Sequence, residues 1–148
     1  MIQNQRLVYL AQTDTTAGFL SQDPQALGLC KQRDDRKPFL ICLESLQTLQ
    51  VFTRVPKKFH KRIRRSKKST FIYPNKQAYR VVKDEKHLQF LEKFRWFYSS
   101  SANHSGSFFE LAYAKQKADI IIEDTRGFFE DTPSKIYKIS RSSIRRIR

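Results

Sequence analysis

The stretch Phe39-Leu40-Ile41-Cys42-Leu43 is a continuous apolar run. Five apolar residues in succession are typical of a β-strand whose two faces are both buried. Before this run, residues 24–31 predict a helix, because Asp23 is a suitable N-cap and Pro24 is favoured at the first helical position. After it, residues 45–54 predict a second helix. A buried strand between two helices favours an α/β fold.

The rest of the chain continues this alternation of strands and helices. Residues 119–123 are expected to be another buried strand, and residues 74–76 a hairpin turn. Because strands and helices interleave without an internal repeat or a low-complexity linker, we expect residues 1–148 to form one α/β domain. The other expected elements are helices at 56–65, 84–94 and 108–117 and strands at 7–11, 69–73, 79–82, 96–99, 136–139 and 144–147.

The chain is strongly basic and also rich in apolar residues. Its 148 residues include 39% hydrophobic residues and 12 Phe, which indicates a folded core rather than a disordered basic tail. Its 29 Lys and Arg residues against 14 Asp and Glu give a formal net charge of +15. This excess predicts a polyanionic partner such as nucleic acid, a nucleotide or an acidic surface. A basic proteome, or membership of a basic complex, would produce the same composition.

The cysteines and histidines give no sign of a metal site. Cys30 and Cys42 form no C-x-x-C pair, and the three histidines are scattered along the chain. Cys42 lies within the apolar run and is expected to pack as a small hydrophobic residue. Free cysteines suit a reducing compartment, and no segment resembles a signal peptide or reaches membrane-spanning length. We therefore expect a cytoplasmic protein with no metal centre and no membrane partner.

Two short polar segments follow apolar ones. Lys31-Gln32-Arg33 places two positive charges at the end of the first predicted helix, and Ser101-Ala102-Asn103 places a hydroxyl and an amide in a loop after a strand. Cations together with neutral hydrogen-bonding groups are what a pocket for an anion or a nucleotide needs. Each segment also has a plainer interpretation, since cations are favoured at helix C-termini and Ser and Asn are common in loops.

Six short blocks, taken in order along the chain, carry a family resemblance. They occupy residues 13–15, 31–33 with 37–38, 69–74, 79–82, 100–106 and 132–136. Their sequences and their order resemble those of the YrdC-like family, the threonylcarbamoyl-AMP synthases of tRNA modification. The resemblance extends over residues 7–148. Its most specific part is the pairing of a Lys-x-Arg block with a Ser-Ala-Asn-x-Ser-Gly block.

The resemblance implies a single YrdC-like domain over residues 1–148, shortened relative to typical members, in which helices flank a twisted mixed β-sheet with a large basic cavity. It implies a nucleotidyltransferase that joins L-threonine, bicarbonate and ATP into threonylcarbamoyl-adenylate and releases pyrophosphate. Mg²⁺ would accompany the triphosphate. A threonylcarbamoyl transferase complex would then pass the threonylcarbamoyl group to tRNA, which acquires threonylcarbamoyladenosine.

The resemblance also assigns roles to individual residues. Lys31 and Arg33 match the family's Lys-x-Arg pair and are the expected catalytic residues. Fixed cations would offset the repulsion between a carbamate and the α-phosphate and stabilise the charge that develops during transfer. Thr13 and Thr15 match the turn that lines the threonine side. The full set of expected substrate- and nucleotide-binding residues is Thr13, Thr15, Lys31, Arg33, Arg80, Ser101, Asn103 and Ser134.

Two departures from the family's pattern bear on the expected pocket. Ala17 stands where the family has an aromatic residue, which would alter the shape of the small-molecule pocket. Lys67 and Lys68 stand where small residues are usual. An alternative hypothesis is therefore a catalytically weak or inactive member of the family that binds double-stranded RNA or tRNA.

A cluster of cations between residues 57 and 68 supports this alternative. Phe59 and Ile63 lie four residues apart, so they would anchor one face of a helix while the cations project into water. A solvated helix face is the plainer interpretation of these charges, and docking of a basic surface on a ribosome or another complex is a third. The expected RNA-binding residues are Lys57, Lys58, Lys61 and Arg62, joined by the C-terminal Arg141, Arg145, Arg146 and Arg148.

Overall fold

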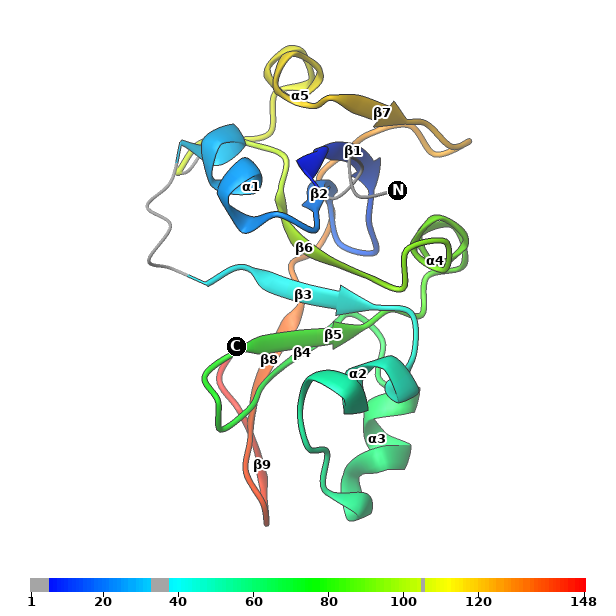
Figure 1. The fold of residues 1–148 in the computed structure, drawn as a ribbon, viewed down its shortest axis with the longest axis vertical. Helices are drawn as coiled ribbons and strands as arrows, with labels where there is room; N and C mark the ends of the chain where they lie inside the picture. The colour runs from blue at the N-terminus through cyan, green and yellow to red at the C-terminus, as the bar shows by residue number, and fades with distance from the viewer. Residues whose placement is uncertain (1–5, 33–37, 105) are drawn as a thin grey trace.

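A mixed β-sheet runs through the molecule (Figure 1). The computed structural model describes residues 6–32, 38–104 and 106–148, so Arg33 lies outside the described residues. Within them, nine strands pair in the order β7-β1-β2-β6-β3-β5-β4-β8-β9. The pairs β1–β7, β3–β5 and β4–β8 are parallel, and the other pairs are antiparallel. The strands are β1 (Tyr9–Gln12), β2 (Ala17–Ser21), β3 (Leu40–Leu43), β4 (Ser69–Ile72), β5 (Ala78–Val81), β6 (Trp96–Ser101), β7 (Ile120–Ile122), β8 (Lys135–Ile139) and β9 (Ile144–Arg146).

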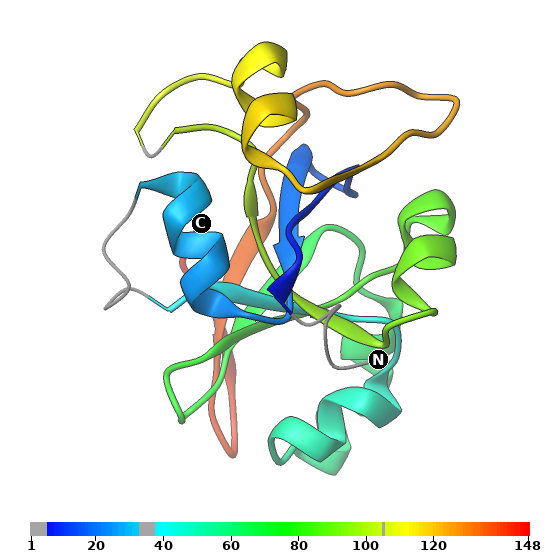
Figure 2. The same cartoon turned by 45° about the horizontal axis from the view of Figure 1, so that its top comes forward.

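Helices lie on both sides of the strands, with α1 and α4 on opposite sides of β1, β2 and β6 (Figure 2). Alternate residues of β1 explain this arrangement. Leu10 packs in one core cluster with Leu27 of α1, whereas Tyr9 packs in another with Leu91 of α4. The helices of the described residues are α1 (Pro24–Lys31), α2 (Leu46–Phe52), α3 (His60–Arg65), α4 (Glu85–Leu91) and α5 (Leu111–Lys117), together with the 3₁₀ helix η2 (Lys57–Phe59).

Strand β3 is buried on both faces, as its apolar run predicted. Ile41 and Leu43 belong to the core cluster beneath α2 and α3, whereas Cys42 belongs to the cluster beneath α4. Burial also raises the pKa of the Cys42 thiol to about 12, so this side chain stays protonated and packs as an apolar group. The mixed sheet flanked by helices confirms the expected α/β class.

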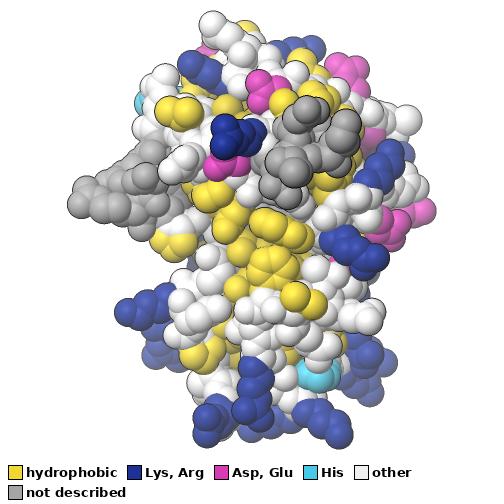
Figure 3. Space-filling model, viewed as in Figure 1, with side chains coloured by type: hydrophobic (Ala, Val, Ile, Leu, Met, Phe, Trp, Pro, Cys, Tyr) yellow, Lys and Arg dark blue, Asp and Glu magenta, His cyan; other side chains and the backbone are white. Residues whose placement is uncertain are grey.

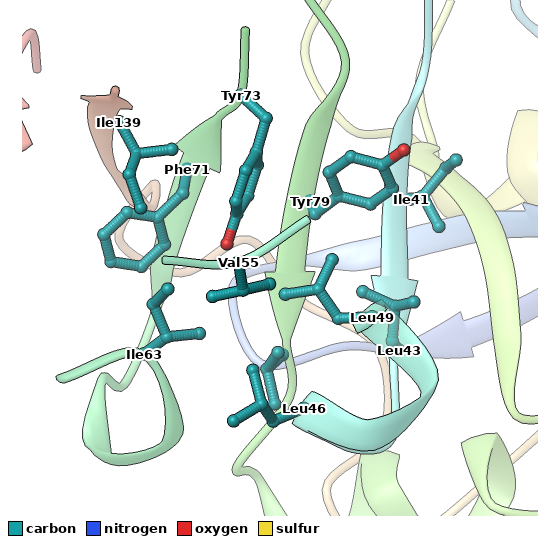
Figure 4. Packing of buried hydrophobic residues seen from close by; sticks show 11 residues of the cluster. Ile41, Leu43, Leu46, Leu49, Val55, Ile63, Phe71, Tyr73, Tyr79 and Ile139 are labelled. Atoms are coloured by element: carbon teal, nitrogen blue, oxygen red, sulfur yellow. The ribbon is translucent and has the colours of Figure 1, made fainter. Parts of the chain in front are cut away.

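The core cluster beneath α2 and α3 also holds the basic segment, residues 57–68, onto the sheet (Figure 4). Ile63 of α3 is only 1% exposed and lies among residues of α2, β4 and β8. Phe59 packs against the edge of the same cluster. The expected anchoring of one face by these two residues is therefore confirmed. The predicted continuous helix over 56–65 is wrong in detail, because it divides into η2 and α3.

Several elements differ from their predicted form. The segment 119–123 is not a buried strand: β7 is an edge strand that pairs only with β1, which leaves Ile120 37% and Ile121 40% exposed. Strand β2 was not predicted, and β6 continues two residues further than expected because Ser101 pairs with Gly18. The predicted hairpin turn is present between β4 and β5, with Lys76 at a positive φ of 67°. None of the described helices combines the length and apolar character needed to cross a membrane.

Candidate functional site

A cleft of about 390 Å³ opens beside the middle strands of the sheet. It gathers residues from the β1–β2 turn, β5, the end of β6, the segment before β8 and the C-terminus. Of the sequence-predicted site residues, it brings together Thr13, Thr15, Arg80, Ser101, Asn103 and Ser134. The complete lining comprises Thr13, Thr15, Thr16, Gly18, Leu40, Arg80, Ser99, Ser100, Ser101, Asn103, Glu130, Asp131, Pro133, Ser134 and Arg148.

The β1–β2 turn is held by the side chain of Thr13. Its Oγ1 accepts hydrogen bonds from the backbone N–H groups of Thr15 and Thr16, at 3.2 Å each, and donates to the carbonyl of Thr16 at 2.6 Å. The next strand approaches this turn so closely that a Cβ on Gly18 would lie 2.8 Å from Cγ2 of Thr13. The absence of a side chain at Gly18 therefore sets the position of Thr13 in the cleft.

Arg80 lies at the floor of the cleft in a network of buried polar groups. Its Nη1 donates to Oδ1 of Asp14 at 3.0 Å and to the hydroxyl of Thr15 at 3.3 Å, and its Nε donates to the hydroxyl of Thr70 at 3.0 Å. The Thr70 hydroxyl lies 3.0 Å from that of Ser134. Because a buried charge needs a partner, the Asp14–Arg80 ion pair makes an arginine at this depth tolerable.

Lys31, at the end of α1, does not line the cleft but binds two residues that do. The Nζ group donates to the carbonyl of Ser101 at 2.7 Å and to Oδ1 of Asn103 at 2.9 Å, and it lies 3.3 Å from the Ser101 hydroxyl. Lys31 as a whole is only 3% exposed. The two polar segments that the sequence singled out are thus joined by direct hydrogen bonds. The predicted contribution of Arg33 lies outside the described residues.

Three charged residues of the cleft lining lie outside the family blocks, and one of them is basic. The Nη2 and Nε groups of Arg148 donate to the carbonyl of Ser134 at 2.9 and 3.2 Å, which places its guanidinium at the cleft wall. Glu130 and Asp131 form another part of the cleft wall. The N–H of Asp131 donates to the carbonyl of Thr15, so this wall is fastened to the β1–β2 turn. The sequence could have indicated Arg148 as a cleft residue only if the pairing of β8 with β9 had been predicted.

Two positions that depart from the family's pattern, Ala17 and Lys68, lie in different surroundings. Ala17 is fully buried in the cluster with Leu10 and Phe19 and does not line the cleft. The reason is the alternation of side chains along β2, which turns Gly18 to the cleft and its two neighbours to the core. Lys68 pairs with Asp131 at 3.1 Å across the rim.

Two buried titratable groups outside the cleft lining are held in their neutral forms. Burial lowers the pKa of His87 to about 4, so this histidine is neutral at ordinary pH. Burial raises the pKa of Cys30 to about 11, which keeps the thiol protonated. Among residues 6–32, 38–104 and 106–148, no group of three or more His, Cys, Asp or Glu side chains is placed to hold a metal ion.

The predicted RNA-binding residues lie away from the cleft. Lys57, Lys58, Lys61 and Arg62 are exposed on η2 and α3. Helix α3 lies at the same end of the molecule as β9 (Figure 1), where Lys and Arg side chains gather on the surface (Figure 3). Arg62 stacks over the ring of Tyr137 at 5.1 Å, and Nζ of Lys58 donates to the carbonyl of Ser142 at 2.8 Å. The helical cations are therefore fastened to the β8–β9 hairpin.

Known proteins match this chain in fold. No protein-family model matches the sequence, and no curated protein matches it. Two structures of P. abyssi Sua5 match over 95–96% of this chain: a double variant with a TM-score of 0.78 at 17% identity, and the complex with L-threonine with 0.76 at 18%. E. coli YciO matches over 99% of this chain and 85% of its own, with a TM-score of 0.76 at 17% identity.

Full-length HypF, in a phosphate- and nucleotide-bound form, matches over 97% of this chain and 27% of its own, with a TM-score of 0.73 at 14% identity. The chain spans about half the length of the Sua5 chains, 52% of one and 50% of the other. The likeness extends over nearly all of this chain and lies in its fold. The chain therefore has the YrdC-like fold that its sequence blocks predicted.

Proposed function

We propose that this chain is a nucleotidyltransferase of the threonylcarbamoyl-AMP synthase type, which forms threonylcarbamoyl-adenylate from L-threonine, bicarbonate and ATP for tRNA modification. The observation that carries the proposal is the convergence on one cleft of Thr13, Arg80, Ser134 and the Lys31-bound segment 101–103. A Sua5 complexed with L-threonine and a nucleotide-bound HypF, both of this fold, support it.

The cleft suits the joining of two anions. In the proposed reaction a carbamate oxygen of N-carboxylated threonine attacks the α-phosphorus of ATP, the bond from this phosphorus to its bridging oxygen breaks, and pyrophosphate leaves. Lys31, Arg80 and Arg148 place three positive charges on or beside the cleft, where they would offset the repulsion between the reactants. Hydroxyls of Thr13 and Thr15 would bind the uncharged parts of threonine.

Mg²⁺ would neutralise the triphosphate and help pyrophosphate leave. Since the described residues offer no metal-binding cluster, the ion would be held mainly by phosphate oxygens and water. Glu130 and Asp131 are the acidic residues of the cleft lining. A threonylcarbamoyl transferase complex would then consume the adenylate on tRNA.

Release of pyrophosphate tests the proposal. Purified protein should release it from ATP only when L-threonine and bicarbonate are both supplied with Mg²⁺. Omission of each component is the first control, and replacement of L-threonine by L-valine, which lacks the hydroxyl, is the second. Arg80→Met should abolish release, whereas Glu44→Gln, in an ion pair outside the cleft lining, should not. Protein that binds ATP and releases no pyrophosphate would contradict the proposal.

A second candidate function is binding of double-stranded RNA or tRNA without catalysis, and the distribution of charge favours it. Residues 45–83 contain twelve Lys and Arg and no Asp or Glu, and residues 132–148 contain six and none. Pairing of β4 with β8 and the contacts of α3 with the β8–β9 hairpin bring these two segments together. One part of the molecule therefore holds more positive charge than the whole chain's net +15.

Within this part, the cations of η2, α3 and the β8–β9 hairpin are available to a partner. Among the described residues, those of η2, α3 and the β8–β9 hairpin form no ion pair with a carboxylate. Few large apolar side chains accompany them, with Ile147 at 52% exposed as the main example. A charged surface that lacks an apolar centre fits a phosphate backbone better than a protein interface.

Salt dependence tests this second function. Neutralisation of Lys57, Lys58, Lys61 and Arg62 to Gln should reduce the slope of log affinity against log salt by roughly 0.7–0.9 for each phosphate that the surface no longer binds. The matched control changes four cations elsewhere, and so gives the same net charge. An equal loss of affinity in both variants would show that only total charge matters. Unchanged affinity in the α3 variant would show that this helix face is solvated and binds no RNA. The control positions are Lys86, Lys93, Lys115 and Lys117.

A further inference from the structure

The guanidinium of Arg80 has unused donors that face the cleft. An arginine has five N–H donors, one on Nε and two on each terminal nitrogen. In Arg80, Nε donates to Thr70, and Nη1 donates to Asp14 and Thr15. No described residue accepts from Nη2, although Arg80 lines the cleft. The two N–H groups of Nη2 are therefore available to an oxyanion, such as a carboxylate or a phosphate.

Asp14 has no access to the cleft itself. Its neighbours Thr13 and Thr15 line the cleft, but the Asp14 side chain, 4% exposed, turns away from it and borders a separate small hollow with Lys83 and Asp84. A ligand in the cleft would touch Arg80 and not Asp14. Any effect of Asp14 on such a ligand must therefore pass through the guanidinium.

The carboxylate also restrains the guanidinium. Rotation about the Nε–Cζ bond exchanges the equivalent Nη1 and Nη2 groups, rotation about the Cδ–Nε bond turns the guanidinium plane, and the 3.0 Å ion pair with Asp14 opposes both motions. The Nε–Thr70 hydrogen bond opposes only the second. We propose that Asp14 is a positioning residue, which holds the plane of the Arg80 guanidinium so that the N–H groups of Nη2 are directed at an oxyanion in the cleft. The identity of this oxyanion rests on the proposed function.

Calorimetric titration with three separate probes would identify the oxyanion. L-Threonine supplies a carboxylate, pyrophosphate supplies phosphate oxygens alone, and ATP supplies phosphates on a nucleotide. Asp14→Asn should weaken binding of the probe that Arg80 holds by roughly tenfold to a hundredfold, the usual range for a charged hydrogen bond. In an Arg80→Met background, the same substitution should have no further effect. If Asp14→Asn and Arg80→Met each reduce affinity and their fold losses multiply in the double variant, the proposal is overturned.

Two controls separate positioning from general damage. Asp14→Glu retains the charge and should restore most of the affinity that Asp14→Asn loses. Glu44→Gln, which breaks a different ion pair outside the cleft lining, should leave affinity unchanged. Loss of affinity in Asp14→Glu equal to that in Asp14→Asn would argue against a role for the carboxylate.

NMR of the Arg80 side chain gives a readout that needs no ligand. In the wild-type protein, the Nη1 and Nη2 groups should give separate signals because rotation about Nε–Cζ is slow. In Asp14→Asn they should merge into one averaged signal. A freely rotating Arg80 in the wild type would overturn the proposal without any variant. If the wild type binds none of the three probes, the proposed function fails, while the NMR result still decides the role of Asp14.

Discussion

Gly18 controls the position of Thr13, and the substitution Gly18→Ala tests this directly. An added Cβ would lie 2.8 Å from Cγ2 of Thr13 and 3.3 Å from the carbonyl oxygen of Ser100. Two carbon atoms in contact prefer about 3.5–4.0 Å. The Thr13 side chain must therefore retreat by about 1 Å, since the neighbouring β6 backbone is held in the sheet.

The displacement has two measurable consequences. Overpacking at a buried site costs about 1–3 kcal/mol of the free energy of unfolding, measured by urea denaturation. A displacement of about 1 Å at a binding group costs about a hundredfold in catalytic rate, so pyrophosphate release should fall by a similar factor if the proposed function holds. The side chain affected is the one whose hydroxyl organises the β1–β2 turn.

A second substitution supplies the control. Thr13→Ser removes Cγ2, the atom that clashes, and retains Oγ with its hydrogen bonds to Thr15 and Thr16. The double variant Gly18→Ala/Thr13→Ser should therefore regain most of the stability that Gly18→Ala loses. Equal stability of the single and double variants would refute the reasoning, as would a Gly18→Ala protein with wild-type stability and activity.

Three further predictions concern buried or ion-paired side chains. Lys31→Ala should lower the free energy of unfolding by about 1–3 kcal/mol in urea denaturation, because the buried ammonium binds oxygens of Ser101 and Asn103; unchanged stability would contradict its place in the core. The pKa of His87 is about 4 in the folded state against 6.5 in its ordinary state, so the unfolded chain binds more protons between these values. Stability should then fall by up to about 3 kcal/mol as the pH drops from 6.5 to 4, and a smaller fall in His87→Gln than in the wild type would confirm the cause. Arg126→Lys should quicken amide exchange in residues 124–131, because a lysine cannot hold two carboxylates and a backbone carbonyl at once; exchange at the wild-type rate would contradict this.

Periodicity and capping signals located most elements, because they depend on local physics. Asp23 caps α1 by accepting from the N–H of Gln25 at 3.0 Å, and the apolar run 39–43 became a doubly buried strand. Strand β2 was not predicted because its residues form a strand by pairing with β1 on one side and β6 on the other. Strand β6 lies far from β2 in the sequence, so local patterns do not indicate this pairing. The exposure of β7 follows from its place at the sheet edge, which composition does not encode.

The candidate site was predicted only in part, because it also depends on pairing between strands that are distant in the sequence. The resemblance supplied Thr13, Arg80 and Ser134 one at a time, but no sequence pattern showed that Thr70 joins the last two. Arg148 was expected among RNA-binding cations, yet its guanidinium lies against Ser134 at the cleft wall. These links arise because β4 pairs with β5 on one side and with β8 on the other.

The same pairing connects the two candidate functions. Strand β8 follows directly on Ser134, which lies in the cleft, and carries Tyr137 further along, beneath Arg62 of the basic surface. Its partner β9 runs back from the basic hairpin tip towards Arg148 at the cleft. A polyanion bound on α3 and the β8–β9 hairpin would therefore lie on the strands that form one cleft wall. Synthesis of the adenylate and binding of RNA would thus be compatible in one molecule, because the side chains proposed for each lie on shared strands.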